Sequence, residues 1–120
     1  MTEVKRHIEI VGYGVCLPKN TVQFKDQTRY RVVENEETQL DLAEVAIQSA
    51  LEKANLKIED IDCLVSASAV GVQPIPCTAA LIHERVAKGF SIPAMDINTT
   101  CTSFISALST MSHLIEAGEY

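Results

Sequence analysis

Hydrophobic and polar residues follow one another along this chain with two periods, one typical of helices and one typical of strands. Apolar residues recur every three or four positions in residues 40–54, in residues 77–88, and in a third stretch that begins at Cys101 and meets a helix stop signal at Gly118. This spacing places the apolar side chains of each stretch on one face. It therefore predicts three helices.

Three other stretches have the signature of β-strands. Residues 7–15 alternate and are rich in β-branched residues, residues 61–69 form an apolar run, and residues 92–97 form a short strand ahead of the third helix. Residues 20–39 are polar and irregular, with a short extended piece expected at 27–33. Strands thus alternate with helices in the order β-α-β-α-β-α, which predicts an α/β fold with a mainly parallel sheet.

The helices carry end signals in the sequence. Thr38 is placed to cap the first helix, with Asp41 three residues later completing an imperfect capping box, and Asn55 is placed to end it. Gly89 closes the second helix. These signals set the helix boundaries more closely than periodicity alone.

The third helix and the strand before it form the stretch around which the chain is organised. A polar corner, Asn98-Thr99-Thr100, separates the two, and Thr99 and Thr100 are placed to cap the helix. Large apolar residues share one face of the helix, and most of its other positions are small: Phe104, Ile105, Leu108, Met111, Leu114 and Ile115 form the apolar set. A helix with so few large polar groups is expected to be buried between layers.

Cys101 stands in the first turn of this predicted helix. Unpaired backbone N–H groups and the positive end of the helix dipole favour a thiolate, which is the nucleophilic form of a cysteine. Open α/β sheets also carry their chemistry at the carboxyl ends of their strands. A small cysteine can equally fill a gap in a core. Position alone leaves both interpretations open.

Composition excludes several classes of function. Residues 1–31 contain six basic and three acidic groups and have a net charge of +3. The remainder contains four basic and thirteen acidic groups and has a net charge of −9. A basic face for binding nucleic acid is therefore not expected. The four cysteines, at positions 16, 63, 77 and 101, are too far apart for a metal site or a disulfide framework. A signal peptide and a membrane-spanning run are both missing from the sequence, which indicates a cytoplasmic protein.

Two glycines near the N-terminus invite a nucleotide-binding interpretation, which the sequence does not support. Gly12 and Gly14 would need a third glycine at position 17 and a helix after it. Leu17 and Pro18 follow instead, so the motif is rejected.

The residues around Cys101 resemble a known family. The segment Asp96-Ile97-Asn98-Thr99-Thr100-Cys101-Thr102-Ser103-Phe104, then Ala107-Leu108, and then a Gly-x-Tyr ending at Tyr120 are similar to the nucleophile segment of β-ketoacyl-acyl carrier protein synthase III, in the thiolase-like superfamily. The strand, the corner, the cysteine and the helix end all occur at the same spacing as in that family. The resemblance implies that residues 1–120 form the amino-terminal part of a thiolase-like domain, with a buried helix that carries the nucleophile.

The resemblance also implies an activity. Cys101 would accept an acyl group from acyl-coenzyme A or acyl-acyl carrier protein, before decarboxylative condensation with a malonyl thioester. Ile75 would reach across a homodimer interface into the acyl pocket of the partner. Neither a metal nor a covalently bound cofactor is implied. The family's other catalytic groups, a histidine and an asparagine, come from its second half, so the 120 residues alone are expected to be inactive in condensation.

This chain departs from the family pattern at two places. Thr102 and Ser103 stand where the family has small residues that typically end in glycine, and residues 20–39 lack the usual length and tryptophan for binding coenzyme A. Two alternatives therefore remain. One is another cysteine acyltransferase of the superfamily, either similar to hydroxymethylglutaryl-CoA synthase or active in secondary metabolism. The other is a non-catalytic scaffold subunit, which would have no need of Cys101.

Overall fold

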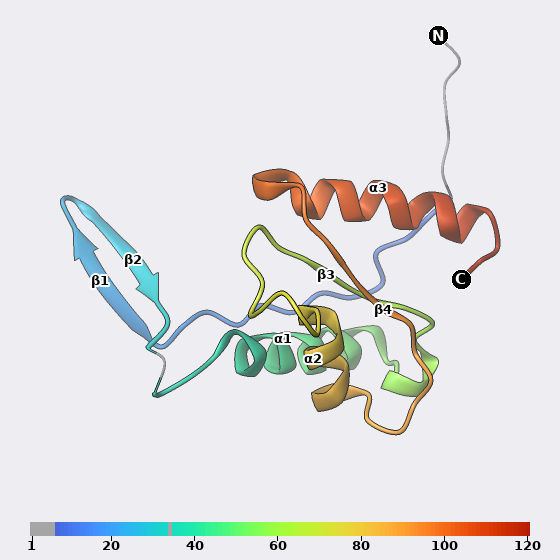
Figure 1. Ribbon diagram of the computed structural model, residues 1–120, viewed down its shortest axis with the longest axis horizontal. Coiled ribbons are helices and arrows are strands. Elements are labelled where there is room, and N and C mark those ends of the chain that lie inside the picture. Colours follow the sequence, from blue (N-terminus) through green and yellow to red (C-terminus); the bar gives the residue numbers. More distant parts are fainter. Residues whose placement is uncertain (1–6, 34) are drawn as a thin grey trace, which may run out of the picture. The chain divides into compact units, whose positions relative to one another are not determined.

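The computed structural model describes residues 7–33 and 35–120. Contacts divide the chain into two compact units, one formed by Val11–Ile58 and the other by Glu59–Tyr120 together with residues 7–10. Among the described residues, the first unit contains a hairpin and a helix. The second contains a pair of strands and two helices, as the colours of Figure 1 show.

The first unit begins its regular structure with a hairpin that the sequence did not predict in full. Strands β1 (Asn20–Phe24) and β2 (Gln27–Arg31) are antiparallel, and Phe24 pairs with Gln27. Only the second strand falls in the extended piece expected at 27–33. The turn uses Lys25 at φ 53° in place of the glycine or asparagine that usually marks a tight hairpin. The sequence therefore lacked the common turn signal.

Helix α1 (Gln39–Ala54) confirms both of its predicted ends. The Asp41 backbone N–H donates to Thr38 Oγ1 over 3.2 Å, and the Thr38 backbone N–H donates to Asp41 Oδ2 over 2.8 Å. This reciprocal pair is a complete capping box. At the other end Asn55 adopts a left-handed conformation with φ 55°, which terminates the helix.

The strand predicted at residues 7–15 is wrong, because these residues join no β-ladder. The segment from Val11 onward alternates in burial, as a strand would, but the two glycines face inward and the large side chains face solvent. A Cβ on Gly12 would lie 2.5 Å from the Ala50 carbonyl oxygen of α1. The glycines thus let the backbone lie directly on α1. The alternating pattern correctly predicted an extended backbone. It could not show that no neighbouring strand pairs with this segment.

The second unit is a parallel strand pair with a helix on either side. Strands β3 (Leu64–Ala67) and β4 (Ala94–Ile97) are parallel, and α2 (Thr78–Val86) connects them. Figure 1 shows the pair running between α2 and the last helix, α3 (Ser103–Glu116). Its buried hydrophobic side chains, among the described residues, come from β3, the two helices and the C-cap of α2: Leu64, Ala79, Ile82, Ala87 and Ala107. This arrangement confirms the predicted parallel order of these strands and helices.

Helix α3 packs through its small residues. Ser103, Ala107 and Ser112 are buried, whereas Phe104 and Ile105 are each 64% exposed. Burial between layers was expected for the whole helix, but within the described residues only one of its faces is covered. Small side chains let the helix approach the strand pair closely. Phe104 and Ile105 are left on the outside, whereas Met111 and Leu114 are half-buried.

Candidate functional site

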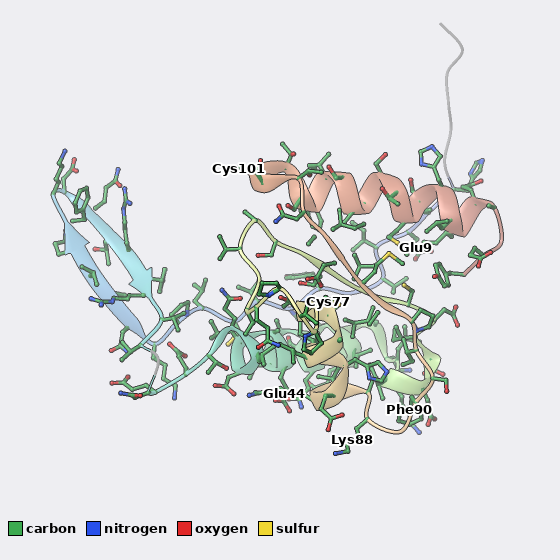
Figure 2. All side chains as sticks on the ribbon, in the orientation of Figure 1. Glu9, Glu44, Cys77, Lys88, Phe90 and Cys101 are labelled. Atoms are coloured by element: carbon green, nitrogen blue, oxygen red, sulfur yellow. The ribbon has the colours of Figure 1, made fainter. Side chains whose placement is uncertain are left out.

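Cys101 lies where β4 gives way to α3. The chain passes from Ile97 through a corner into a single 3₁₀ turn, η2 (Thr100–Thr102), and α3 begins at Ser103. The sequence placed Cys101 in the first turn of the helix, and the structure places it in the 3₁₀ turn directly before it. The thiol is free and exposed. Figure 2 shows Cys101 at the beginning of α3.

The expected threonine caps do not form. Thr99, at the N-cap position of η2, makes no side-chain cap, and the Thr100 hydroxyl donates to the Thr99 carbonyl oxygen over 2.7 Å. Ser103 supplies the contacts instead: its Oγ accepts from the Thr99 backbone N–H over 3.0 Å and donates to the Thr100 carbonyl oxygen over 2.7 Å. A buried serine thus ties the corner to the first residue of α3. A glycine at this position could not make either bond.

Asn98 connects the corner to the neighbouring strand. Its Nδ2 donates to the Ala69 carbonyl oxygen, just past β3, over 3.0 Å. Its Oδ1 accepts from the Thr100 backbone N–H over 2.9 Å. Only this orientation of the amide satisfies both partners. Thr100 has φ 55°, a left-handed conformation that is unusual for a β-branched residue.

Asp96 connects β4 to the start of α2. Its two carboxylate oxygens accept from the backbone N–H groups of Thr78, over 2.9 Å, and of Ala79, over 2.7 Å. Cys77, the residue at the N-cap position, makes no side-chain cap. A carboxylate is well suited to this place, because it faces the positive end of the helix dipole. An aspartate inside a strand is uncommon, and that was the available signal in the sequence.

A cavity of about 460 Å³ lies beside this corner. It is lined by residues 69–74 together with Asp96 and Asn98. The lining includes neither Cys101 nor Ile75, so the structure does not bring the two predicted site residues into this cavity. Ile75 projects from the adjoining loop and is 87% exposed. Its carbonyl oxygen accepts from Gln73 Nε2 over 2.9 Å.

Three titratable groups with shifted pKa values, among the described residues of this unit, lie apart from Cys101. The hydrogen bond and charge of Lys88 lower the pKa of Glu84, and Glu84 in turn raises the pKa of Lys88, in an exposed pair one turn apart on α2. A hydrogen bond with Cys63 raises the pKa of Tyr120. Figure 2 shows Lys88 well separated from Cys101. These shifts therefore belong to local pairs and not to the candidate site.

Residues 7–33 and 35–120 contain neither a metal-binding cluster nor a membrane-spanning helix. No group of three or more histidine, cysteine or acidic side chains in this part of the chain is arranged to hold a metal ion. Among the same residues, none of the helices has both the length and the apolar character required to cross a membrane.

Comparison with known proteins identifies relatives over nearly the whole chain. No protein-family model matches. A curated relative from Clostridium acetobutylicum, named β-ketoacyl-[acyl-carrier-protein] synthase III, is 30% identical over 94% of this chain and 39% of its own length. The chain therefore spans about two fifths of the length of this relative.

Solved structures give the same result for the fold. The crystal structure of 3-oxoacyl-[acyl-carrier-protein] synthase III from Aquifex aeolicus matches with a TM-score of 0.82 and 30% identity, over 91% of this chain and 40% of that one. A tetronic acid condensing enzyme, AbyA1, matches with a TM-score of 0.80 and 25% identity, over 90% of this chain and 38% of that one. These matches confirm the predicted α/β, thiolase-like fold class.

Proposed function

Since this chain is a relative of the β-ketoacyl-[acyl-carrier-protein] synthase III proteins, we propose that Cys101 accepts an acyl group from a thioester. The observation that carries the proposal is the position of an exposed, free cysteine in the turn between a parallel strand and a helix. At this position the thiol is open to a substrate. The N-terminal end of α3 directly follows it.

The first chemical step follows from this geometry. The Cys101 sulfur attacks the carbonyl carbon of an acyl thioester, and a new carbon–sulfur bond forms. The bond between that carbon and the sulfur of the donor breaks, and the donor leaves as a thiolate that takes up a proton. The products are an acyl-cysteine and a free carrier thiol.

We extend the proposal to the whole protein on the basis of its relatives. The acyl group on Cys101 would condense with a malonyl thioester, with an acyl carrier protein or coenzyme A as the donor carrier, in the cytoplasm. A second candidate is a condensing enzyme of secondary metabolism. The similarity to the tetronic acid condensing enzyme favours it.

The test is to find the acyl group on the protein. Incubation with a short-chain acyl thioester, followed by peptide mapping, is expected to place one acyl group per chain on Cys101. The linkage should be cleaved by neutral hydroxylamine, as thioesters are. Acylation spread over several cysteines, or none, would contradict the proposal and favour a scaffold subunit.

We further propose that Ile75 limits the length of the acyl chain by entering the acyl pocket of a partner subunit in a homodimer. The exposure of Ile75 on a projecting loop supports this role. Replacing Ile75 with phenylalanine is expected to lower kcat/KM for longer acyl donors relative to acetyl donors by about tenfold, because the pocket loses volume. The measurement is kcat/KM across a series of acyl donors with the whole protein. Val15→Phe, a bulky change at an exposed position outside this loop and outside the cavity lining, is the control. Unchanged ratios for Ile75→Phe would contradict the role.

A further inference from the structure

Thr100 adopts its left-handed conformation immediately before the proposed nucleophile. A threonine resists this conformation because its branched Cβ crowds the backbone, whereas glycine adopts it freely. The conformation persists only where the surroundings hold it. The direction in which the chain enters residue 101 depends on it.

Ser103 ties this corner to α3, and the Asn98 side chain ties it to the segment that follows β3. One end of the Asn98 amide accepts from the Thr100 backbone N–H, and the other donates to the Ala69 carbonyl oxygen, 29 residues away in the sequence. The corner is therefore tied to the end of β3 as well as to its own strand, β4. A hydrogen bond between two residues of the corner would not prevent the corner from moving as a whole. The bond from Asn98 to Ala69 resists such a movement, because Ala69 follows a different strand, β3.

We propose that Asn98 is a positioning residue for Cys101, which it holds at the start of α3 by stabilising the left-handed conformation of Thr100. This inference rests on the proposed function for the role of Cys101. Asn98 makes no contact with the sulfur and acts through the backbone. Without it, Thr100 would relax toward an ordinary conformation, and the thiol would leave its place ahead of the first backbone N–H groups of α3.

The test compares the rates at which iodoacetamide alkylates Cys101 in four forms of the protein, with peptide mapping to assign each cysteine. Asn98→Ala is expected to slow alkylation of Cys101 by about three- to tenfold, the equivalent of one lost hydrogen bond. Thr100→Gly alone is expected to stay within about twofold of the unmodified protein. The double variant Asn98→Ala/Thr100→Gly is expected to recover the original rate, because glycine needs no help to adopt the conformation.

Two controls separate positioning from a general loss of structure. Cys77, at the start of α2, should be alkylated at the same rate in all four forms. Asn20→Ala removes a side-chain hydrogen bond to Glu36 in the other unit and should leave Cys101 unaffected. Faster hydrogen exchange at the Thr100 amide is also expected in Asn98→Ala.

The outcomes for the two proposals are distinct. An unchanged Cys101 rate in Asn98→Ala, or a double variant as slow as Asn98→Ala, would overturn the positioning role. If Cys101 of the unmodified protein reacts no faster than a model thiol, the proposed function is contradicted. The test of the positioning role remains valid in that case. It compares the alkylation rates of the variants with one another and measures hydrogen exchange at the Thr100 amide.

Discussion

Replacing Cys101 with alanine is expected to abolish acylation of the protein and to reduce condensation by roughly 10³-fold or more, since removing a nucleophile leaves only binding and electrostatic effects. The other three free cysteines offer no substitute, because Cys16, Cys63 and Cys77 are all partly buried. The measurements are covalent labelling with an acyl thioester and steady-state turnover by the whole protein.

Cys77→Ala is the matched control for this prediction. Cys77 also stands at the start of a helix, at the N-cap position of α2. Cys77 differs from Cys101 in two ways: its side chain is partly buried, and it does not follow a strand directly. Full activity is expected in Cys77→Ala. Equal losses in the two variants would contradict the assignment of Cys101 as the sole acyl acceptor.

Replacing Gly14 with alanine is expected to destabilise the Val11–Ile58 unit by about 3 kcal/mol or more. A Cβ at this position would overlap the Ala46 carbonyl oxygen and would lie 3.0 Å from the Ala50 backbone nitrogen. These are backbone atoms of α1, which cannot rotate away as the end of a side chain could. The segment would have to separate from the helix. Urea denaturation followed by circular dichroism measures the loss.

Gly89→Ala separates this steric effect from the ordinary cost of changing a glycine. Gly89 has φ 88°, and a Cβ there would meet nothing within 4 Å. The expected loss in the free energy of unfolding is about 1–2 kcal/mol, because only the reluctance of alanine to adopt a left-handed backbone contributes. A smaller loss in Gly14→Ala than in Gly89→Ala would show that the close approach to α1 is not a structural requirement.

The sequence predicted those features that depend on neighbouring residues. The ends of α1 follow from Thr38, Asp41 and Asn55, whose contacts span a few positions, and the structure confirms them. The place of Cys101 ahead of a helix was predicted to within one turn. Hydrophobic periodicity and helix-end signals involve residues that are close in the sequence. They therefore predict features that depend only on such neighbours.

Features that depend on distant residues were not predicted. Asp96 caps a helix that begins 18 residues earlier, and Asn98 bonds to a carbonyl 29 residues away. The extended segment after Ile10 had the right alternation but no ladder partner among the described residues. For α3, periodicity identified the apolar face, but the structure packs the helix through Ser103 and Ala107 instead. Each of these outcomes depends on which surfaces meet in space.

The β1–β2 hairpin offers a consequence for the evolution of this protein. Nine of its ten strand residues are exposed, and it is held by its own ladder, by Lys25 and Arg29 over the ring of Phe24, and by Glu36 and Glu37 at its base. Mutations in it therefore cost the folded state little. A segment under so few packing constraints among the described residues can accept substitutions and changes of length while the Val11–Ile58 unit keeps its fold.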